Sequence, residues 1–187
     1  MSPPFVAVDA GPEAVFGYGD VGADVLVVGD APGVHGGVET GVPLSGTPAL
    51  LDVLAAVGLL SGPTAEPIPS NCYLTYRHHC RLPDERRPTE SEYAQCEPHL
   101  DAEIRAINPH ILVSVGPSAT EHVFEVYTTK RPPDTPPHAT TVHGRGFLVV
   151  PSWDPREWTT GDGEELRQCL EDVLESDYRQ TKGGKRR

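Results

Sequence analysis

Lysine is scarce in this sequence, and positive charge as a whole is in deficit. Lys and Arg number 15 against 27 Asp and Glu, for a formal net charge of −12, and only Lys130, Lys182 and Lys185 are lysines. A strongly acidic chain stays soluble by self-repulsion, so we expect a salt-loving source; an ordinary acidic cytosolic protein is the alternative. The acid surplus argues against clamping nucleic acid by bulk charge, although a local basic groove remains compatible with it.

Long apolar runs are missing as well. No run approaches the roughly 18 residues that a membrane span needs, and the N-terminal stretch does not resemble a signal peptide. We therefore expect a cytoplasmic protein without a membrane partner. Apolar residues still make up 37% of the 187 residues, too many for a disordered chain. We expect a monomer with a single domain over residues 1–178 and a basic, disordered tail over 179–187.

Cysteine is rare, and its spacing is uninformative about disulfides. The four cysteines are Cys72, Cys80, Cys96 and Cys169. They are too few and too scattered for a disulfide framework, and no CxxC pair supports a zinc site. Free thiols are the simplest interpretation.

The pattern of hydrophobic residues predicts strands that alternate with helices. Strands are expected over 24–28, 72–75 and 110–115, with a hairpin or a bend into a fourth strand over 141–150. Helices are expected over 47–58, 89–107, 117–126 and 164–178, the second of them started by the capping box Thr89–Glu92. The proline-rich segments 61–70 and 129–138 are expected to be loops. This order predicts an α/β fold, a three-layer α/β/α sandwich with a small, mostly parallel central sheet.

In sheets of this kind, ligands bind beyond the carboxyl ends of the strands. Three predicted loops lie at that edge: 29–46, 76–88 and 151–157. Function is therefore expected in these three segments.

Several short motifs occur in these loops and around them in a fixed order. They include VVGDAPG at 27–33, GVPLSG at 41–46, YLTYRHHCRLP at 73–83, CEPHL at 96–100, INPHI at 107–111, VGPSA at 115–119 and PSWDP at 151–155. Together they resemble the motifs of the uracil-DNA glycosylase superfamily, and most closely its iron–sulfur (family 4) branch. The resemblance covers roughly residues 24–157, and it implies the α/β/α fold predicted above and DNA as the partner.

The resemblance also implies candidate site residues, several of which differ from the family pattern. Asp30 stands where the family has Glu, and Leu44 replaces its base-stacking Phe. Tyr76 replaces its uracil-reading Asn, and Asp154 replaces its His. Because a carboxylate beside a departing base anion would raise the barrier, a shifted base preference is one hypothesis.

We expect Asp30 and Asp154 to be the catalytic residues, Asp30 by orienting water or steadying the sugar cation and Asp154 by touching the base edge. The alternatives are purely structural roles, as a turn-forming residue for Asp30 and as a helix cap for Asp154. Backbone N–H groups of residues 30–34 are expected to hold water or phosphate.

The expected base pocket is lined by the residues Gly29, Ala31, Pro32, Gly33, Leu44, Tyr76 and Trp153. Alternatively, Leu44 serves packing, Tyr76 lies at the rim and Trp153 is buried in the core. The expected DNA-binding residues are Arg77, Arg81, Arg87 and Arg145. The alternative for the arginine-rich loop is a solvated segment with salt bridges to Asp84 and Glu85.

The iron–sulfur branch implies four cysteine ligands, of which Cys80 and Cys96 match two. Residues 1–71 contain no cysteine, so the other two ligands are absent. Two ligands do not hold a 4Fe-4S cluster, and we expect two residual thiols that lie near each other.

Three functions remain open from the sequence. The first is a diverged DNA glycosylase that hydrolyses the N-glycosidic bond of uracil or another damaged base in base-excision repair, with no metal at the chemistry. The second is a catalytically inactive member that binds damaged or single-stranded DNA. The third is a structural partner with no role on nucleic acid.

Overall fold

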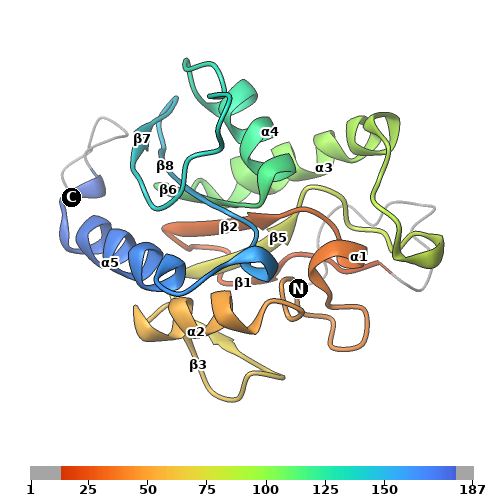
Figure 1. The fold of residues 1–187 in the computed structure, drawn as a ribbon, viewed down its shortest axis with the longest axis horizontal. Helices are drawn as coiled ribbons and strands as arrows, with labels where there is room; N and C mark the ends of the chain where they lie inside the picture. The colour runs from red at the N-terminus through yellow and green to blue at the C-terminus, as the bar shows by residue number, and fades with distance from the viewer. Residues whose placement is uncertain (1–13, 180–187) are drawn as a thin grey trace.

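The computed structural model describes residues 14–179, and a mixed six-stranded sheet lies at the centre of this part (Figure 1). The strand order is β1-β5-β2-β6-β8-β7. The strands are β1 (Tyr18–Gly19), β2 (Val25–Gly29), β5 (Cys72–Tyr76), β6 (Ile111–Val115), β7 (Val142–His143) and β8 (Leu148–Ser152). Residues 1–13, and 180–187 of the expected tail, lie outside the described part.

The four central strands, β5, β2, β6 and β8, run parallel, and every residue in them is buried. Runs such as Val25–Gly29 are apolar without alternation because both faces of a parallel sheet are covered. The two-residue strands β1 and β7 pair antiparallel at the two edges. Since the central strands are parallel, their carboxyl ends meet at one edge of the sheet.

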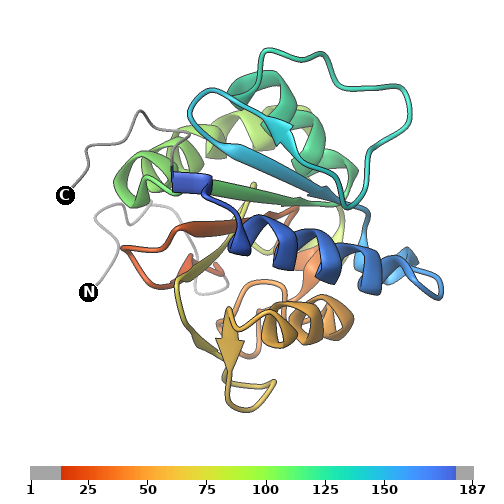
Figure 2. The same ribbon diagram turned by 90° about the vertical axis from the view of Figure 1, so that its left-hand side faces the viewer.

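Helices cover both faces of the sheet, as Figure 2 shows. The long helices are α2 (Pro48–Ala56), α3 (Glu90–Ile107), α4 (Pro117–Tyr127) and α5 (Asp162–Glu175). Leu50, Leu54 and Leu166 of α2 and α5 pack into the core on one face. Leu100 and Val123 of α3 and α4 pack into the core on the other. The predicted three-layer α/β/α sandwich is confirmed.

Most predicted elements are present with small shifts of their ends. The capping box is present: Thr89 Oγ1 accepts from the Glu92 N–H at 3.3 Å, and Glu92 Oε2 accepts from the Thr89 N–H at 2.8 Å. The segment 141–150 forms the β7–β8 hairpin. No helix in the described part is long and apolar enough to cross a membrane.

Two predicted loops contain short elements that the sequence did not indicate. The loop 29–46 holds the four-residue helix α1 (Pro32–His35), and 61–70 holds the small hairpin of β3 (Leu60–Ser61) and β4 (Ile68–Pro69). Elements of two to four residues are too short to produce a hydrophobic period. The last helix begins at Asp162 and ends at Glu175, rather than spanning 164–178.

Candidate active site

The carboxyl ends of β2 and β8 bring two predicted site residues together through a histidine. Asp30 directly follows β2, and Asp154 lies two residues beyond β8. The Asp30 N–H donates to His35 Nδ1 at 3.1 Å, and His35 Nε2 lies 3.4 Å from Asp154 Oδ1. Because the Nδ1 lone pair accepts this hydrogen bond, the ring carries a hydrogen on Nε2, the nitrogen that faces Asp154.

Asp30 lies at the bottom of the site, 2% exposed. The Tyr93 hydroxyl donates to Asp30 Oδ1, and in the described part of the chain no other group donates to this carboxylate. Burial and the hydrogen bond to Asp30 raise the pKa of Tyr93, so the phenol stays a donor. The Arg77 guanidinium stacks on the Tyr93 ring at 4.1 Å from its centroid. Asp30 is therefore oriented by a residue 63 positions away in the sequence.

Two glycines of the VVGDAPG motif allow neighbouring segments to pack closely against the end of β2 and against α1. A Cβ on Gly29 would lie 2.6 Å from Leu44 Cδ2, and one on Gly33 would lie 2.9 Å from the Glu85 carbonyl oxygen. The loop after β5 can therefore pack directly on α1, which closes the site from that side.

The turn over residues 30–34 bonds two of its four backbone N–H groups internally. The Asp30 N–H is bonded to His35, the Val34 N–H donates to the Ala31 carbonyl at 3.0 Å, and Pro32 has no N–H. The Ala31 and Gly33 N–H groups make no hydrogen bond within the described part of the chain, so the turn bonds only half of the N–H groups that were expected to hold water or phosphate.

Asp154 is 3% exposed and holds an arginine that the sequence analysis did not single out. Arg156 Nη2 donates to Asp154 Oδ2 at 2.6 Å, Arg156 Nε donates to Oδ1 at 3.0 Å, and the Arg156 N–H donates to Oδ1 at 3.0 Å. Burial raises the pKa of Asp154, but His35 and Arg156 outweigh it and hold the pKa well below its usual range. Asp154 is thus an anion in place. It also caps the short helix Pro155–Glu157, as the alternative interpretation predicted.

Tyr76 and Leu44, expected to line a base pocket, are completely buried. The Tyr76 hydroxyl accepts from the Leu44 N–H and donates to the Gly36 carbonyl, both at 2.7 Å. The Tyr76 ring stacks beside His35, with centroids 6.4 Å apart. Leu44 has a left-handed φ of 68°, which the bond to Tyr76 helps to hold. In this conformation, side chains of the protein itself fill the space between loop 36–44 and the strand ends.

Trp153 is neither in the core nor in this closed space. It is 40% exposed and lies just past the end of β8. Its position is at the rim of the site.

Among the expected DNA-binding residues, Arg77 is inside the protein. It is 8% exposed, Nη1 donates to Ser118 Oγ at 2.9 Å, and Nη2 lies 3.5 Å from Glu97 Oε1. Its contacts and its stacking on Tyr93 assign it a structural part behind Asp30.

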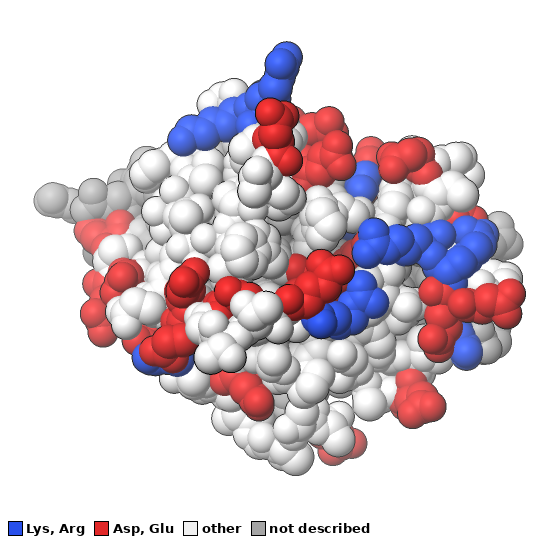
Figure 3. Space-filling view, in the orientation of Figure 1, with Lys and Arg blue, Asp and Glu red and all other residues white. Residues whose placement is uncertain are grey.

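The other three arginines are exposed but not all at one edge. Arg81, whose Nη2 lies 3.8 Å from Glu85 Oε1, and Arg87 follow β5 at the carboxyl edge. Basic side chains gather there beside α1 (Figure 3). Arg145 lies elsewhere: its N–H donates to the carbonyl of Tyr127, the last residue of α4, in the turn that leads into the amino end of β8. The structure does not bring Arg145 to the site.

The cysteines do not form a cluster site. Burial raises the pKa of Cys80, and burial together with the nearby Cys80 raises the pKa of Cys96. Cys72 is buried in β5 and Cys169 lies on α5, so neither joins them. The donor set does not fit a 4Fe-4S cluster.

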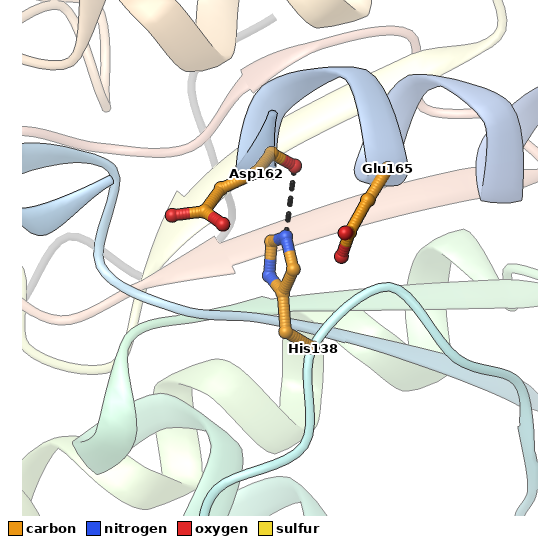
Figure 4. Close-up of side chains that lie close together, drawn as sticks. All are labelled: His138, Asp162 and Glu165. Atoms are coloured by element: carbon orange, nitrogen blue, oxygen red, sulfur yellow. Dashed lines mark hydrogen bonds between the residues drawn. The ribbon is translucent and has the colours of Figure 1, made fainter. Parts of the chain in front are cut away.

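His138, Asp162 and Glu165 are a group of three possible metal ligands in the described part (Figure 4). His138 Nε2 donates to the Asp162 carbonyl at 2.8 Å, and Nδ1 accepts from the Trp153 N–H at 3.0 Å. With both ring nitrogens used, His138 has no lone pair left for a metal.

A mostly parallel sheet with helices on both faces defines the doubly wound class of α/β proteins, in which ligands bind at the carboxyl edge where Asp30 and Asp154 lie. The family described as the uracil DNA glycosylase superfamily matches residues 16–175, and the chain belongs to that superfamily. The resemblance inferred from the motifs is confirmed.

Relatives of two types cover most of the chain. The type-4 uracil-DNA glycosylase of Saccharolobus solfataricus is 27% identical over 173 residues, 90% of this chain and 74% of the relative. The type-5 uracil-DNA glycosylase of Thermus thermophilus is 32% identical over 171 residues, 84% of this chain and 76% of the relative. A type-5 enzyme of Pyrobaculum aerophilum is 29% identical over 84% of this chain and 72% of its own length.

Proposed function

We propose that this protein is a DNA glycosylase that hydrolyses the N-glycosidic bond of uracil or another damaged base in DNA, as in base-excision repair. The observation that carries the proposal is the meeting of Asp30, His35 and the Asp154–Arg156 pair at the carboxyl edge, in a chain of this superfamily. The acidic composition is consistent with a protein that acts in the cytoplasm at high salt. We propose that it acts as a monomer with a single domain.

The chemistry assigns a role to each carboxylate. When the bond between C1′ and the base nitrogen breaks, the electron pair leaves with the base and the sugar becomes cationic. Asp30 would stabilise that cation and hold the water whose oxygen bonds to C1′, and the proton that this water loses would neutralise the departing base anion. Asp154 would not oppose the departing anion, because Arg156 neutralises its charge at 2.6 Å.

Base preference would depend on opening loop 36–44. Tyr76 and Leu44 are fully buried, so a flipped base must displace them. A tyrosine offers one hydroxyl to a base edge, whereas an amide offers a donor and an acceptor. This difference supports a base preference shifted away from uracil.

Single-turnover cleavage of strands bearing uracil, hypoxanthine, xanthine or mismatched thymine tests the proposal. Cleavage of one of them is expected, and Asp30→Asn should abolish it. The matched control is Asp52→Asn, on the exposed side of α2, which should cleave like the wild type. Absence of cleavage on every strand would refute the proposal.

The closed site favours a second candidate, a catalytically inactive member that binds DNA. Asp30 is bonded to Tyr93, and Tyr76 ties down the loop above it. DNA retention without cleavage of any base, in wild type and Asp30→Asn alike, would support this function instead.

A further inference from the structure

The rim beside the closed site carries an exposed and rigidly held aromatic ring. Trp153 is 40% exposed, yet its indole N–H donates to the Pro136 carbonyl at 2.7 Å. One face of the indole stacks on His138, with centroids 4.7 Å apart and planes 22° apart. The ring is therefore fixed from one side, and its exposed surface is available to a ligand.

The ring behind Trp153 is itself fixed. His138 is 9% exposed and is held between the Asp162 carbonyl and the Trp153 N–H, as Figure 4 shows for the first of these. Trp153 is thus preorganised, and stacking on it would cost little side-chain entropy.

Three residues further along, Arg156 offers a cation that is equally well oriented. Asp154 engages Nε and Nη2, and in the described part of the chain Nη1 makes no hydrogen bond. The Arg156 side chain is 43% exposed, whereas its anchor Asp154 is 3% exposed. A buried carboxylate that grips one edge of a guanidinium presents the other edge to a ligand outside.

We propose that Trp153 and Arg156 form a binding surface for an unpaired nucleotide of DNA, with the base stacked on the indole and the phosphate on Nη1. DNA as the ligand rests on the proposed function. An aromatic platform beside a cation is the combination that binds single strands without sequence preference. Stacking would carry much of the affinity, because the chain as a whole, at −12, repels DNA.

This surface is distinct from the place where a base would react. Asp30 is 2% exposed, whereas Trp153 is 40% exposed at the rim. The surface would hold a neighbouring nucleotide of the strand, and it needs no damaged base.

Tryptophan fluorescence tests the stacking directly, since Trp153 and Trp158 are the two tryptophans of the chain. Each variant is titrated with an undamaged single-stranded oligothymidylate, and binding is followed in parallel by anisotropy of the labelled strand. Trp158→Phe should retain saturable quenching, and Trp153→Phe should lose it. Trp153→Ala should weaken binding on the order of tenfold.

The salt dependence of binding tests the phosphate contact. Arg156→Gln should lower the slope of log K against log salt by about 0.7, the value for one phosphate contact on a single strand. Arg105→Gln is the matched control, because Arg105 lies in the last turn of α3 and is exposed at the opposite edge of the sheet. It should leave the slope unchanged.

Unquenched Trp153 emission with a bound strand, an unchanged slope in Arg156→Gln, or no binding at all would each overturn the inference. Cleavage of a damaged strand together with any of these results would overturn the inference alone. Quenching and the slope change without cleavage would uphold the surface and overturn the glycosylase proposal.

Discussion

The hydroxyl of Tyr76 offers the sharpest test of how the site is held closed. It connects the Leu44 N–H and the Gly36 carbonyl, at 2.7 Å each, to the end of β5. Tyr76→Phe keeps the ring and removes only this bridge. The substitution should destabilise the protein and loosen loop 36–44.

The magnitude follows from the burial of the two groups that lose their partner. Leu44 is fully buried, so its N–H stays dry, at a cost of about 2 kcal/mol. Gly36 is only partly buried, and its carbonyl can recover water, at a cost of about 1 kcal/mol or less. Together the loss is about 2–3 kcal/mol in the free energy of unfolding.

Urea denaturation of wild type and Tyr76→Phe, with unchanged m-values, measures this loss. Tyr18→Phe is the control, since its hydroxyl makes a single part-buried bond to the Pro67 carbonyl at 2.8 Å. It should cost about 1 kcal/mol or less. Amide exchange at Leu44 should accelerate only in Tyr76→Phe. Equal losses in the two variants would refute the bridging role of Tyr76.

Three further predictions concern charge and thiols. Asp154→Asn should cost about 2 kcal/mol at pH 7, because it breaks the charge-assisted bonds to Arg156. The folded-state pKa of Asp154 is lowered, so this contribution is present above about pH 4 and is lost as the pH falls further. The free energies of unfolding of wild type and variant should therefore converge in acid. A difference between them that stays constant with pH would contradict this. Burial raises the pKa of Cys72 to about 12, so iodoacetamide should alkylate it only in unfolded protein, as mass spectrometry of native and denatured samples can check. Elemental analysis of anaerobically purified protein should find no iron, because Cys80 and Cys96 lack two partners; stoichiometric iron would contradict this.

Much of the fold could be predicted because its signals are local. Apolar runs predicted strands β2, β5 and β6, and the Thr89–Glu92 capping box predicted the start of α3. The place of the site was predicted as well, since parallel strands end at the same edge of the sheet and bring the loops that follow them together. Asp30 and Asp154 accordingly lie near the same histidine.

The partners of these carboxylates could not be predicted, because they depend on contacts distant in sequence. Tyr93 meets Asp30 across 63 positions, although it lies among the buried residues of α3 with Leu100 and Ile104. His35 lies in a glycine-rich loop without periodicity, where nothing marks a side chain as buried. Arg156 could not be predicted as the partner of Asp154, because a helix cap and an ion pair share the same short sequence.

The two outer strands are short, and this affects whether two molecules of the protein can pair edge to edge. β1 and β7 are two residues long, so each border of the sheet exposes very little backbone for another chain to continue. Edge-to-edge aggregation starts from long edge strands with unpaired backbone groups, and both edge strands of this sheet are short. High salt weakens charge repulsion, and under that condition the short outer strands would protect against aggregation when the net charge no longer does.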